Sequence, residues 1–304
     1  MPSNQTPLGA LPARFRRERL LIVGCGDVGL RAARFQRHVR VLALTSSPER
    51  VQQLRAQGIT PLQGNLDDAA SVRRLAGLAT RVLHLAPPAQ HGQTDMRSQH
   101  LSRALLLRTT PKHLVYGSTS GVYGDCQGAW VNETRSLAAQ TPRALRRVDA
   151  EAQLRVWALR SGATLSILRI PGIYALDREG GTPRERLLRG TPVLQAADDV
   201  FTNHIQADDL ARACLAALWR GKPQRSYNVN DDTQLKMGDY FDMAANILGL
   251  PQPPRISRAE AHTRLPAMQL SFMSESRRLD NTRMKRELRL RLRYPHTAQG
   301  LSQT

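Results

Sequence analysis

The stretch RLLIVGCGDVG, Arg19 to Gly29, decides the fold. Its first six residues form a short apolar run that ends at a glycine, a pattern typical of a buried strand. Gly24, Gly26 and Gly29 follow with the spacing G-x-G-x-x-G, and the next residues, LRAARFQRH, predict a helix. A strand, a glycine-rich turn and a helix in this order predict a βαβ unit with a phosphate-binding turn.

Strand and helix patterns alternate from this unit to about residue 118. We expect further strands at 39–44, 59–64, 81–86 and 112–118, and helices at 48–56, 68–77 and 94–109. Strands joined by helices form right-handed crossovers. The sequence therefore predicts an α/β fold with a doubly wound parallel (Rossmann) sheet.

The regular alternation ends near residue 171. Glycine and proline cluster in DREGGTPRERLLRGTPV, 177–193, which predicts a mobile segment over a cleft, and two amphipathic helices follow it. We expect a Rossmann domain at 19–170 and a smaller C-terminal substrate lobe at 171–304, with segments that return to the first domain. Residues 1–18 are interpreted as a disordered extension rather than a transit peptide.

The charge of the chain is strongly basic, at +19 with a pI near 11.2. All but four of its 44 basic residues are arginine, they are spread along the chain, and aromatic residues make up only 5%. Few stacking platforms are thus available, and nucleic acid is an unlikely partner. The densest basic run, 277–293, is interpreted as a solvated helix face.

The cysteines and the hydropathy of the chain indicate the cellular compartment in which the protein is expected. The three cysteines are far apart and form no metal-ligand pattern, so we expect a reducing, cytoplasmic location and no metal. No apolar run approaches the roughly 18 residues of a membrane span, so we expect no membrane partner.

The glycine turn and the end of the second strand describe one nucleotide site. Gly24 permits the tight turn, Gly26 lets the backbone approach a pyrophosphate, and Gly29 lets helix and strand pack closely. Cys25, Asp27 and Val28 complete the turn. The second strand ends in LTSSPER, where an NAD site usually has an acid. Thr45, Ser46 and Arg50 favour NADP over NAD. The alternative is that Ser47 caps the helix and Arg50 is solvated.

Later segments carry a family resemblance. LVYGSTSGVYGD (114–125), LRIPGIYA (168–175), FTNHIQADDLARAC (201–214), YNVNDD (227–232) and the Tyr294–Pro295 pair occur in this order. Together with the glycine turn they resemble the short-chain dehydrogenase/reductase superfamily, in its extended branch of NAD-dependent epimerases and dehydratases, and more closely its atypical members. The resemblance implies cofactor contacts from the following residues: Asn65, Leu66, Ala86, Pro87, Pro171 and Ile173. It implies that Thr119, with Ser118 beside it, orients the substrate oxygen.

The catalytic Tyr-x-x-x-Lys of the resembled family is absent. Glu151 aligns with the acid that follows the tyrosine by eight residues, which places Arg143 at the tyrosine position and Arg147 at the lysine position. Arginine cannot exchange protons near neutrality, because its pKa exceeds about 12. It can stabilise a developing oxyanion or clamp a carboxylate or phosphate, and Arg147 can replace the lysine charge.

The face of the 142–160 helix leaves two locations open for these arginines. Leu145, Val148, Ala152, Val156 and Leu159 form an apolar stripe that predicts the core face. Arg143 and Arg147 lie opposite this stripe, either in solvent or in a cofactor cleft. The apolar faces of this helix and of the 94–109 helix leave a homodimer open.

Two functions compete at this point. The first is an NAD(P)-binding oxidoreductase or epimerase that acts on an unknown small molecule with a rearranged proton donor. The second is an NADP(H)-binding sensor or scaffold without turnover. A basic nucleic-acid-binding protein is a distant alternative.

Overall fold

The computed structural model describes residues 18–36 and 38–302. The extension expected at 1–18 therefore lies outside the described residues, apart from Glu18. Within the described part, no helix is both long and apolar enough to cross a membrane.

The central element is a seven-stranded sheet in the order β12-β7-β5-β4-β1-β2-β3, with every neighbouring pair parallel. The strands are β1 (Arg19–Val23), β2 (Arg40–Thr45), β3 (Thr60–Gln63), β4 (Arg81–His84), β5 (His113–Thr119), β7 (Thr164–Ile170) and β12 (Arg225–Asn228). This confirms the predicted doubly wound sheet. The strand order reverses between β1 and β4, and ligands of such sheets bind at this reversal, beyond the carboxyl ends of the strands.

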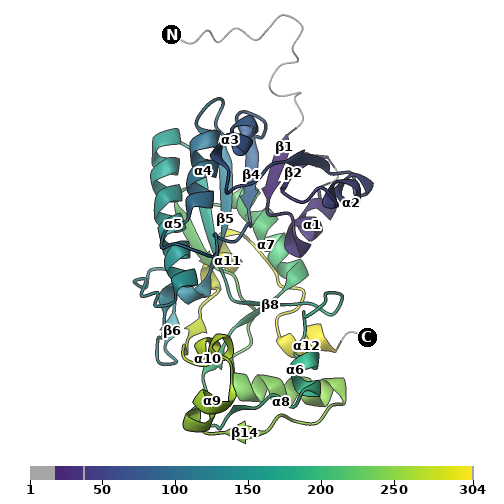
Figure 1. The fold of residues 1–304 in the computed structure, drawn as a ribbon, viewed down its shortest axis with the longest axis vertical. Helices are drawn as coiled ribbons and strands as arrows, with labels where there is room; N and C mark the ends of the chain where they lie inside the picture. Colours follow the sequence, from purple (N-terminus) through teal and green to yellow (C-terminus); the bar gives the residue numbers. More distant parts are fainter. Residues whose placement is uncertain (1–17, 37, 303–304) are drawn as a thin grey trace, which may run out of the picture.

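Helices cover both faces of the sheet (Figure 1). Side chains alternate along β1, so that Leu20 and Ile22 enter one core while Leu21 and Val23 enter the other. The first core is closed by α1 (Asp27–Arg34), α2 (Arg50–Ala56) and α7 (Ala207–Arg220). The second is closed by α3 (Ala69–Val72), η2 (Arg73–Leu75), α4 (Met96–Leu105) and α5 (Pro142–Ser161). Burial on both faces explains why the strands are continuous apolar runs.

A smaller group of short elements lies beyond the carboxyl ends of the strands (Figure 1). The paired strands there are β8 (Gly172–Tyr174) with β11 (His204–Gln206), β9 (Val193–Leu194) with β14 (Arg255–Ile256), and β10 (Phe201–Thr202) with β13 (Leu235–Lys236). The helices are α6 (Arg184–Leu188), α8 (Met237–Leu248), α9 (Arg258–Arg264), α10 (Ala267–Phe272) and α12 (Thr297–Leu301). A core of its own, which includes Leu187, Val193 and Phe241, holds this lobe together. The segment 177–193 thus contains a helix with a buried leucine.

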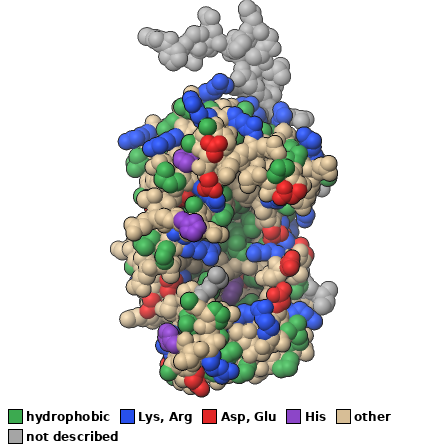
Figure 2. Space-filling model, in the orientation of Figure 1, with side chains coloured by type: hydrophobic (Ala, Val, Ile, Leu, Met, Phe, Trp, Pro, Cys, Tyr) green, Lys and Arg blue, Asp and Glu red, His purple; other side chains and the backbone are tan. Residues whose placement is uncertain are grey.

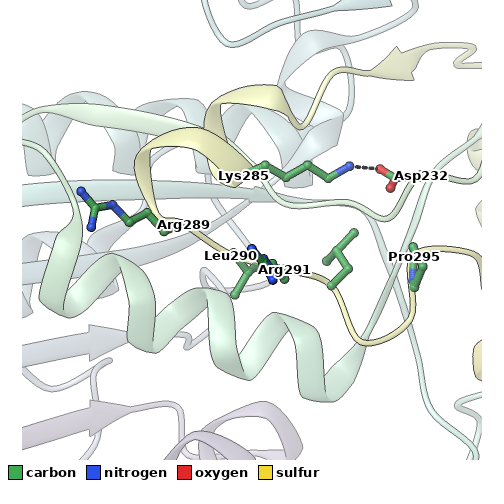
Figure 3. A pocket seen from close by; sticks show the side chains of 7 residues that line it. Asp232, Lys285, Arg289, Leu290, Arg291 and Pro295 are labelled. Carbon is green, nitrogen blue, oxygen red and sulfur yellow. Dashed lines mark hydrogen bonds and ion pairs between the residues drawn. The ribbon is translucent and has the colours of Figure 1, made fainter.

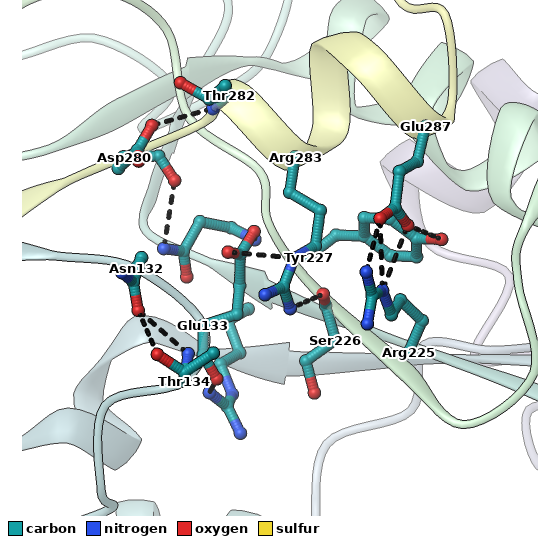
Figure 4. Close-up of polar contacts among 12 residues, drawn as sticks. Asn132, Glu133, Thr134, Arg225, Ser226, Tyr227, Asp280, Thr282, Arg283 and Glu287 are labelled. Atoms are coloured by element: carbon teal, nitrogen blue, oxygen red, sulfur yellow. Dashed lines mark hydrogen bonds and ion pairs between the residues drawn. The ribbon is translucent and has the colours of Figure 1, made fainter.

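The C-terminal segment returns to the edge of the sheet. There η3 (Ser120–Tyr123) follows β5, β6 (Trp130–Val131) pairs with β15 (Arg278–Leu279), and α11 (Thr282–Glu287) packs beside β12. Glu287 accepts a hydrogen bond from Arg225 at 2.6 Å, and Glu133 pairs with Arg283 at 3.4 Å (Figure 4). The first pair joins α11 to β12, and the second joins α11 to the segment that follows β6.

The interpretation of 277–293 as one solvated helix face is wrong. Only Thr282–Glu287 is an α-helix, and residues 288–296 belong to no helix or strand. Leu288 and Leu290 are buried, whereas Arg289 and Arg291 are exposed. Leucine and arginine alternate here with a period of two, which differs from the period of a helix with one buried face.

The burial of Asp231 leads us to expect that the stability of the protein depends on pH. It is 1% exposed and accepts hydrogen bonds from the Thr233 N–H and the Thr297 hydroxyl, both at 3.0 Å. Burial raises the pKa of Asp231 to about 7 despite these hydrogen bonds. The folded state holds the Asp231 proton more tightly than the unfolded chain. The protonated carboxyl therefore adds to the free energy of unfolding at low pH, and this contribution is lost as the pH rises through about 7.

We therefore expect wild type to lose free energy of unfolding relative to Asp231→Asn as the pH rises from about 4 to about 8. Urea denaturation of both proteins across this range measures the difference. The comparison with the variant removes the contributions of other buried groups such as His84 and His204. Parallel stability curves would contradict the assignment.

Candidate active site

The three glycines after β1 differ in what surrounds them. Gly24 has a φ of +84°, and a Cβ there would stand 2.3 Å from the Ala86 nitrogen, so only glycine fits. A Cβ on Gly29 would lie 3.2 Å from Ile22 Cγ2, which shows close packing of α1 on β1. A Cβ on Gly26 would meet nothing within 4 Å. The backbone at Gly26 therefore borders open space at the start of α1.

A cavity of about 430 Å³ lies at this turn. Of the predicted residues, it is lined by Gly24, Gly26, Asp27, Val28, Gly29, Ser118, Thr119, Arg143, Arg147, Pro171 and Ile173. Figure 2 shows a recess with hydrophobic side chains inside it on one face of the molecule, and charged side chains along its edges. The structure thus brings the glycine turn, the end of β5 and the start of α5 to one space.

The other predicted residues do not line this cavity: Cys25, Thr45, Ser46, Arg50, Asn65, Leu66, Ala86 and Pro87. They lie at or just beyond the carboxyl ends of β1 to β4. The side chains of Cys25, Thr45, Leu66 and Ala86 are buried, so these four residues offer a ligand mainly their backbone.

Arg50 crosses from α2 to the glycine turn. Its Nη2 donates a hydrogen bond to the Cys25 carbonyl at 2.6 Å. Ser47 does not cap α2, whose N-cap residue is Glu49 and has no side-chain cap. The alternative of a Ser47 cap with a solvated Arg50 is therefore wrong. A guanidinium is fixed between the ends of β1 and β2.

The core face of α5 differs from the predicted one. Thr141 caps the helix through the Ala144 N–H at 3.2 Å, with Pro142 in the first turn. However, Leu145, Val156 and Leu159 are 44%, 48% and 73% exposed, so the predicted apolar stripe is wrong. The buried apolar residues of α5 are instead Ala144, Ala150, Leu154, Trp157 and Ala158, and this face packs against the sheet and α4. The homodimer expected at the apolar faces stays a prediction.

Arg147 is therefore buried and not solvated. It is 8% exposed, whereas Arg143 is exposed and also lines the cavity. Arg147 Nη1 donates to the Gly117 carbonyl at 2.7 Å, to the Tyr116 hydroxyl at 3.0 Å and to the Ala86 carbonyl at 3.4 Å. No carboxylate among the described residues pairs with it. Buried charges are normally paired with an opposite charge, so this guanidinium can still pair with an anionic group.

Ser118 and Thr119 have different partners. The Ser118 hydroxyl donates to Glu151 at 2.7 Å, and Glu151 in turn pairs with the buried Arg169 at 2.8 Å. Burial alone would lower the pKa of Arg169, but the Glu151 carboxylate outweighs it and the pKa is raised. The Thr119 oxygen only accepts the Gly121 N–H at 3.3 Å. Thr119 is therefore the hydroxyl with a proton free for a ligand.

Comparison with known proteins agrees with this geometry. The model of the NAD dependent epimerase/dehydratase family matches residues 26–230. The chain belongs to this family. The match confirms the resemblance seen in the sequence. No curated protein matches the chain in sequence.

Solved structures share the fold of this family member over most of its length. A functionally unknown conserved protein from Silicibacter pomeroyi DSS is 30% identical, with 93% of this chain and 96% of that chain covered and a TM-score of 0.78. UDP-glucose 4-epimerase from Thermotoga maritima is 18% identical, with coverages of 93% and 96% and a TM-score of 0.76. A nucleoside-diphosphate-sugar epimerase from Pseudomonas aeruginosa is 21% identical, with coverages of 94% and 95% and a TM-score of 0.76.

A buried arginine on α1 of the family member fixes a segment of chain beside the cavity. Arg31 is 5% exposed and binds Asp27 at 3.0 Å, Asp208 at 2.7 Å and Asp177 at 2.5 Å. Asp177 follows β8, and its neighbour Arg178 lines the cavity. Arg178 was not predicted from the sequence, and neither were the other cavity residues Leu85, Gly117, Ile170 and Leu210.

The cavity wall is positively charged. Three arginines, Arg143, Arg147 and Arg178, line it, and none of them has a carboxylate partner among the described residues. Among the described residues of the lining, Asp27 alone carries a carboxylate, and Arg31 already binds it. Partial burial and the charge of Arg147 lower the pKa of Arg143. Such a wall favours anionic ligands.

A second cavity, of about 490 Å³, lies between α11, the segment after it and Asp232 (Figure 3). It contains none of the predicted site residues, and its Lys285 is paired with Asp232 at 2.5 Å. No group of three or more His, Cys, Asp or Glu side chains among residues 18–36 and 38–302 could hold a metal ion. The cavity at the glycine turn, which holds the predicted residues, is therefore the candidate active site.

Proposed function

We propose that the protein binds NADP(H) in the cavity at the glycine turn and exchanges a hydride with a small-molecule carbonyl or alcohol. The open backbone at Gly26 carries this proposal, because no described residue fills the space that a Cβ would enter. The pyrophosphate would bind there to the first N–H groups of α1, where the helix dipole favours an anion. The bound nicotinamide would supply or accept the hydride.

The preference for NADP rests on the end of β2. This position has Thr45 and Ser46 and no acid, while Arg50 is held across the turn by the Cys25 carbonyl. A guanidinium and a serine hydroxyl suit a 2′-phosphate. Two solved neighbours, MoeE5 and the UDP-glucuronic acid 4-epimerase from Bacillus cereus, are complexes with NAD. The proposed preference is thus a property of this chain's own residues.

Arg50→Ala is expected to weaken NADPH binding about tenfold and to leave NADH binding within about twofold, since one charge-assisted contact to the 2′-phosphate is lost. Isothermal titration calorimetry with both cofactors measures this. Arg55→Ala, an exposed change on the same helix, is the matched control. An equal loss for both cofactors would contradict the role of Arg50.

The residues expected beside the nicotinamide would catalyse the reaction without a tyrosine as proton donor. Thr119 would donate a hydrogen bond to the substrate oxygen, and Arg147 would stabilise negative charge beside it. None of the described cavity residues is a tyrosine, histidine, lysine or cysteine. Tyr116 contacts Arg147 but is 0% exposed, and burial raises its pKa to about 12. Solvent would therefore be the proton source.

The lack of a tyrosine, histidine, lysine or cysteine among the described cavity residues also favours a second candidate, an NADP(H)-binding protein without turnover. Incubation with NADPH and a panel of ketones and aldehydes separates the two. Loss of the near-ultraviolet absorbance of NADPH supports the oxidoreductase. Tight binding without consumption supports the sensor. Two solved neighbours, the UDP-glucose 4-epimerase from Thermotoga maritima and MoeE5, are complexes with UDP-glucose, so sugar nucleotides are one class to include in the panel.

A further inference from the structure

One end of the cavity has cationic donors that the protein leaves unused. Arg147 makes all of its hydrogen bonds to described residues through Nη1, and its buried Nε has no acceptor. Arg143 makes no hydrogen bond or ion pair with any described residue. Both side chains line the cavity. A buried guanidinium that is only partly satisfied, beside a second free one, points to a missing anionic partner.

The pyrophosphate of a cofactor is too far away to be this partner. Arg147 binds the Gly117 carbonyl on β5, whereas the glycine turn follows β1. Strand β4 lies between β1 and β5. Neighbouring strands are about 4.8 Å apart, so the two ends of the cavity are separated by about 10 Å. The arginines of α5 are therefore left for a group on the substrate.

We propose that Arg143 and Arg147 bind a carboxylate of the substrate, attached directly to its reacting carbonyl carbon. This inference rests on the proposed function and names its substrate class, the 2-oxo and 2-hydroxy acids. Guanidinium and carboxylate groups match in planar, two-point geometry. Because Arg147 is tied to Gly117, two residues before the Thr119 hydroxyl, the anion must lie close to the carbonyl oxygen. A phosphate ester would be at least two bonds further from it.

Each residue then has a distinct role. Thr119 donates to the carbonyl oxygen, while Arg143, at the start of α5, binds the carboxylate and orients the substrate. Arg147, fixed by three acceptors, adds positive charge beneath both groups. In the reductive direction the carbonyl carbon receives a hydride and its oxygen takes a proton from solvent, which gives the 2-hydroxy acid. The arginine at the tyrosine position thus recognises an anion and transfers no proton.

Oxamate and oxamide provide the matched test, because they differ chiefly by one carboxylate. Each is titrated by calorimetry into the free protein and into the NADPH-loaded protein. We expect oxamate to bind at least about tenfold more tightly than oxamide. Arg143→Ala should remove at least about tenfold of the oxamate affinity and leave NADPH affinity within about threefold. Arg160→Ala, an exposed change at the other end of α5, should change neither.

Arg147→Lys is the second variant, because it keeps the buried charge and loses the planar fork. We expect it to fold and to bind oxamate more weakly than wild type. Equal affinity for oxamate and oxamide, no oxamate binding in either state, or tighter binding of methyl phosphate than of oxamate would each overturn the proposal. If NADPH does not bind but Arg143 still controls oxamate binding to the free protein, the proposed function fails while the anion site stands.

Discussion

Replacement of Gly26 by valine is expected to reduce NADPH affinity by at least about 100-fold, with thermal stability close to that of wild type. Gly26 has a φ of −80° and a ψ of −155°, outside the positive-φ region that favours glycine. Its Cβ would enter empty space and touch no protein atom within 4 Å. The valine side chain would therefore occupy the place proposed for the pyrophosphate.

Gly24→Ala separates this effect from a folding defect. A Cβ on Gly24 would collide with the backbone of Ala86, and the residue has a positive φ, so this variant should lose stability. Thermal unfolding and calorimetric titration of both variants give the comparison. Normal NADPH binding by Gly26→Val would show that the open space at this turn is not the pyrophosphate site.

The second large effect concerns the buried pair of Glu151 and Arg169. Arg169→Leu is expected to lower the free energy of unfolding by about 3–5 kcal/mol, because it leaves a buried carboxylate without its cation. Glu151 is 1% exposed, and its two oxygens accept from Arg169 Nε at 3.2 Å and Nη2 at 2.8 Å. Arg169 also donates to the Tyr123 hydroxyl at 2.9 Å.

The double variant Glu151→Leu with Arg169→Leu tests the cause. Removal of both charges avoids the unpaired carboxylate, so this protein should be more stable than Arg169→Leu alone. Urea denaturation of the three variants and the wild type measures the coupling. A loss below about 1 kcal/mol for Arg169→Leu, in the range of exposed pairs, would contradict the buried-pair account.

The sheet could be predicted from sequence because its signals are local. Each strand is an apolar run bounded by turn residues, and burial on both faces keeps these runs continuous. The density of basic residues at 277–293 predicts one solvated helix face, and this prediction is wrong. The alternation of leucine with arginine from Leu288 to Arg293, which does not follow a helical period, is visible in the sequence.

The face of α5 could not be predicted because tertiary partners decide it. A helical pattern assigns leucine to the core and arginine to solvent. Arg147 reverses this, since carbonyl groups from β5 and from the turn after β4 accept its hydrogen bonds. These acceptors are far from Arg147 in sequence. Arg178 was missed for a similar reason: Arg31 on α1 holds its neighbour Asp177 beside the cavity.

Calorimetric titration of the wild-type protein with NADPH and with NADH tests the central claim most directly. The open turn at Gly26 and the Arg50 contact with Cys25 predict one NADPH bound per chain, with NADH bound more weakly. If neither NADPH nor NADH binds to the protein, the account is contradicted.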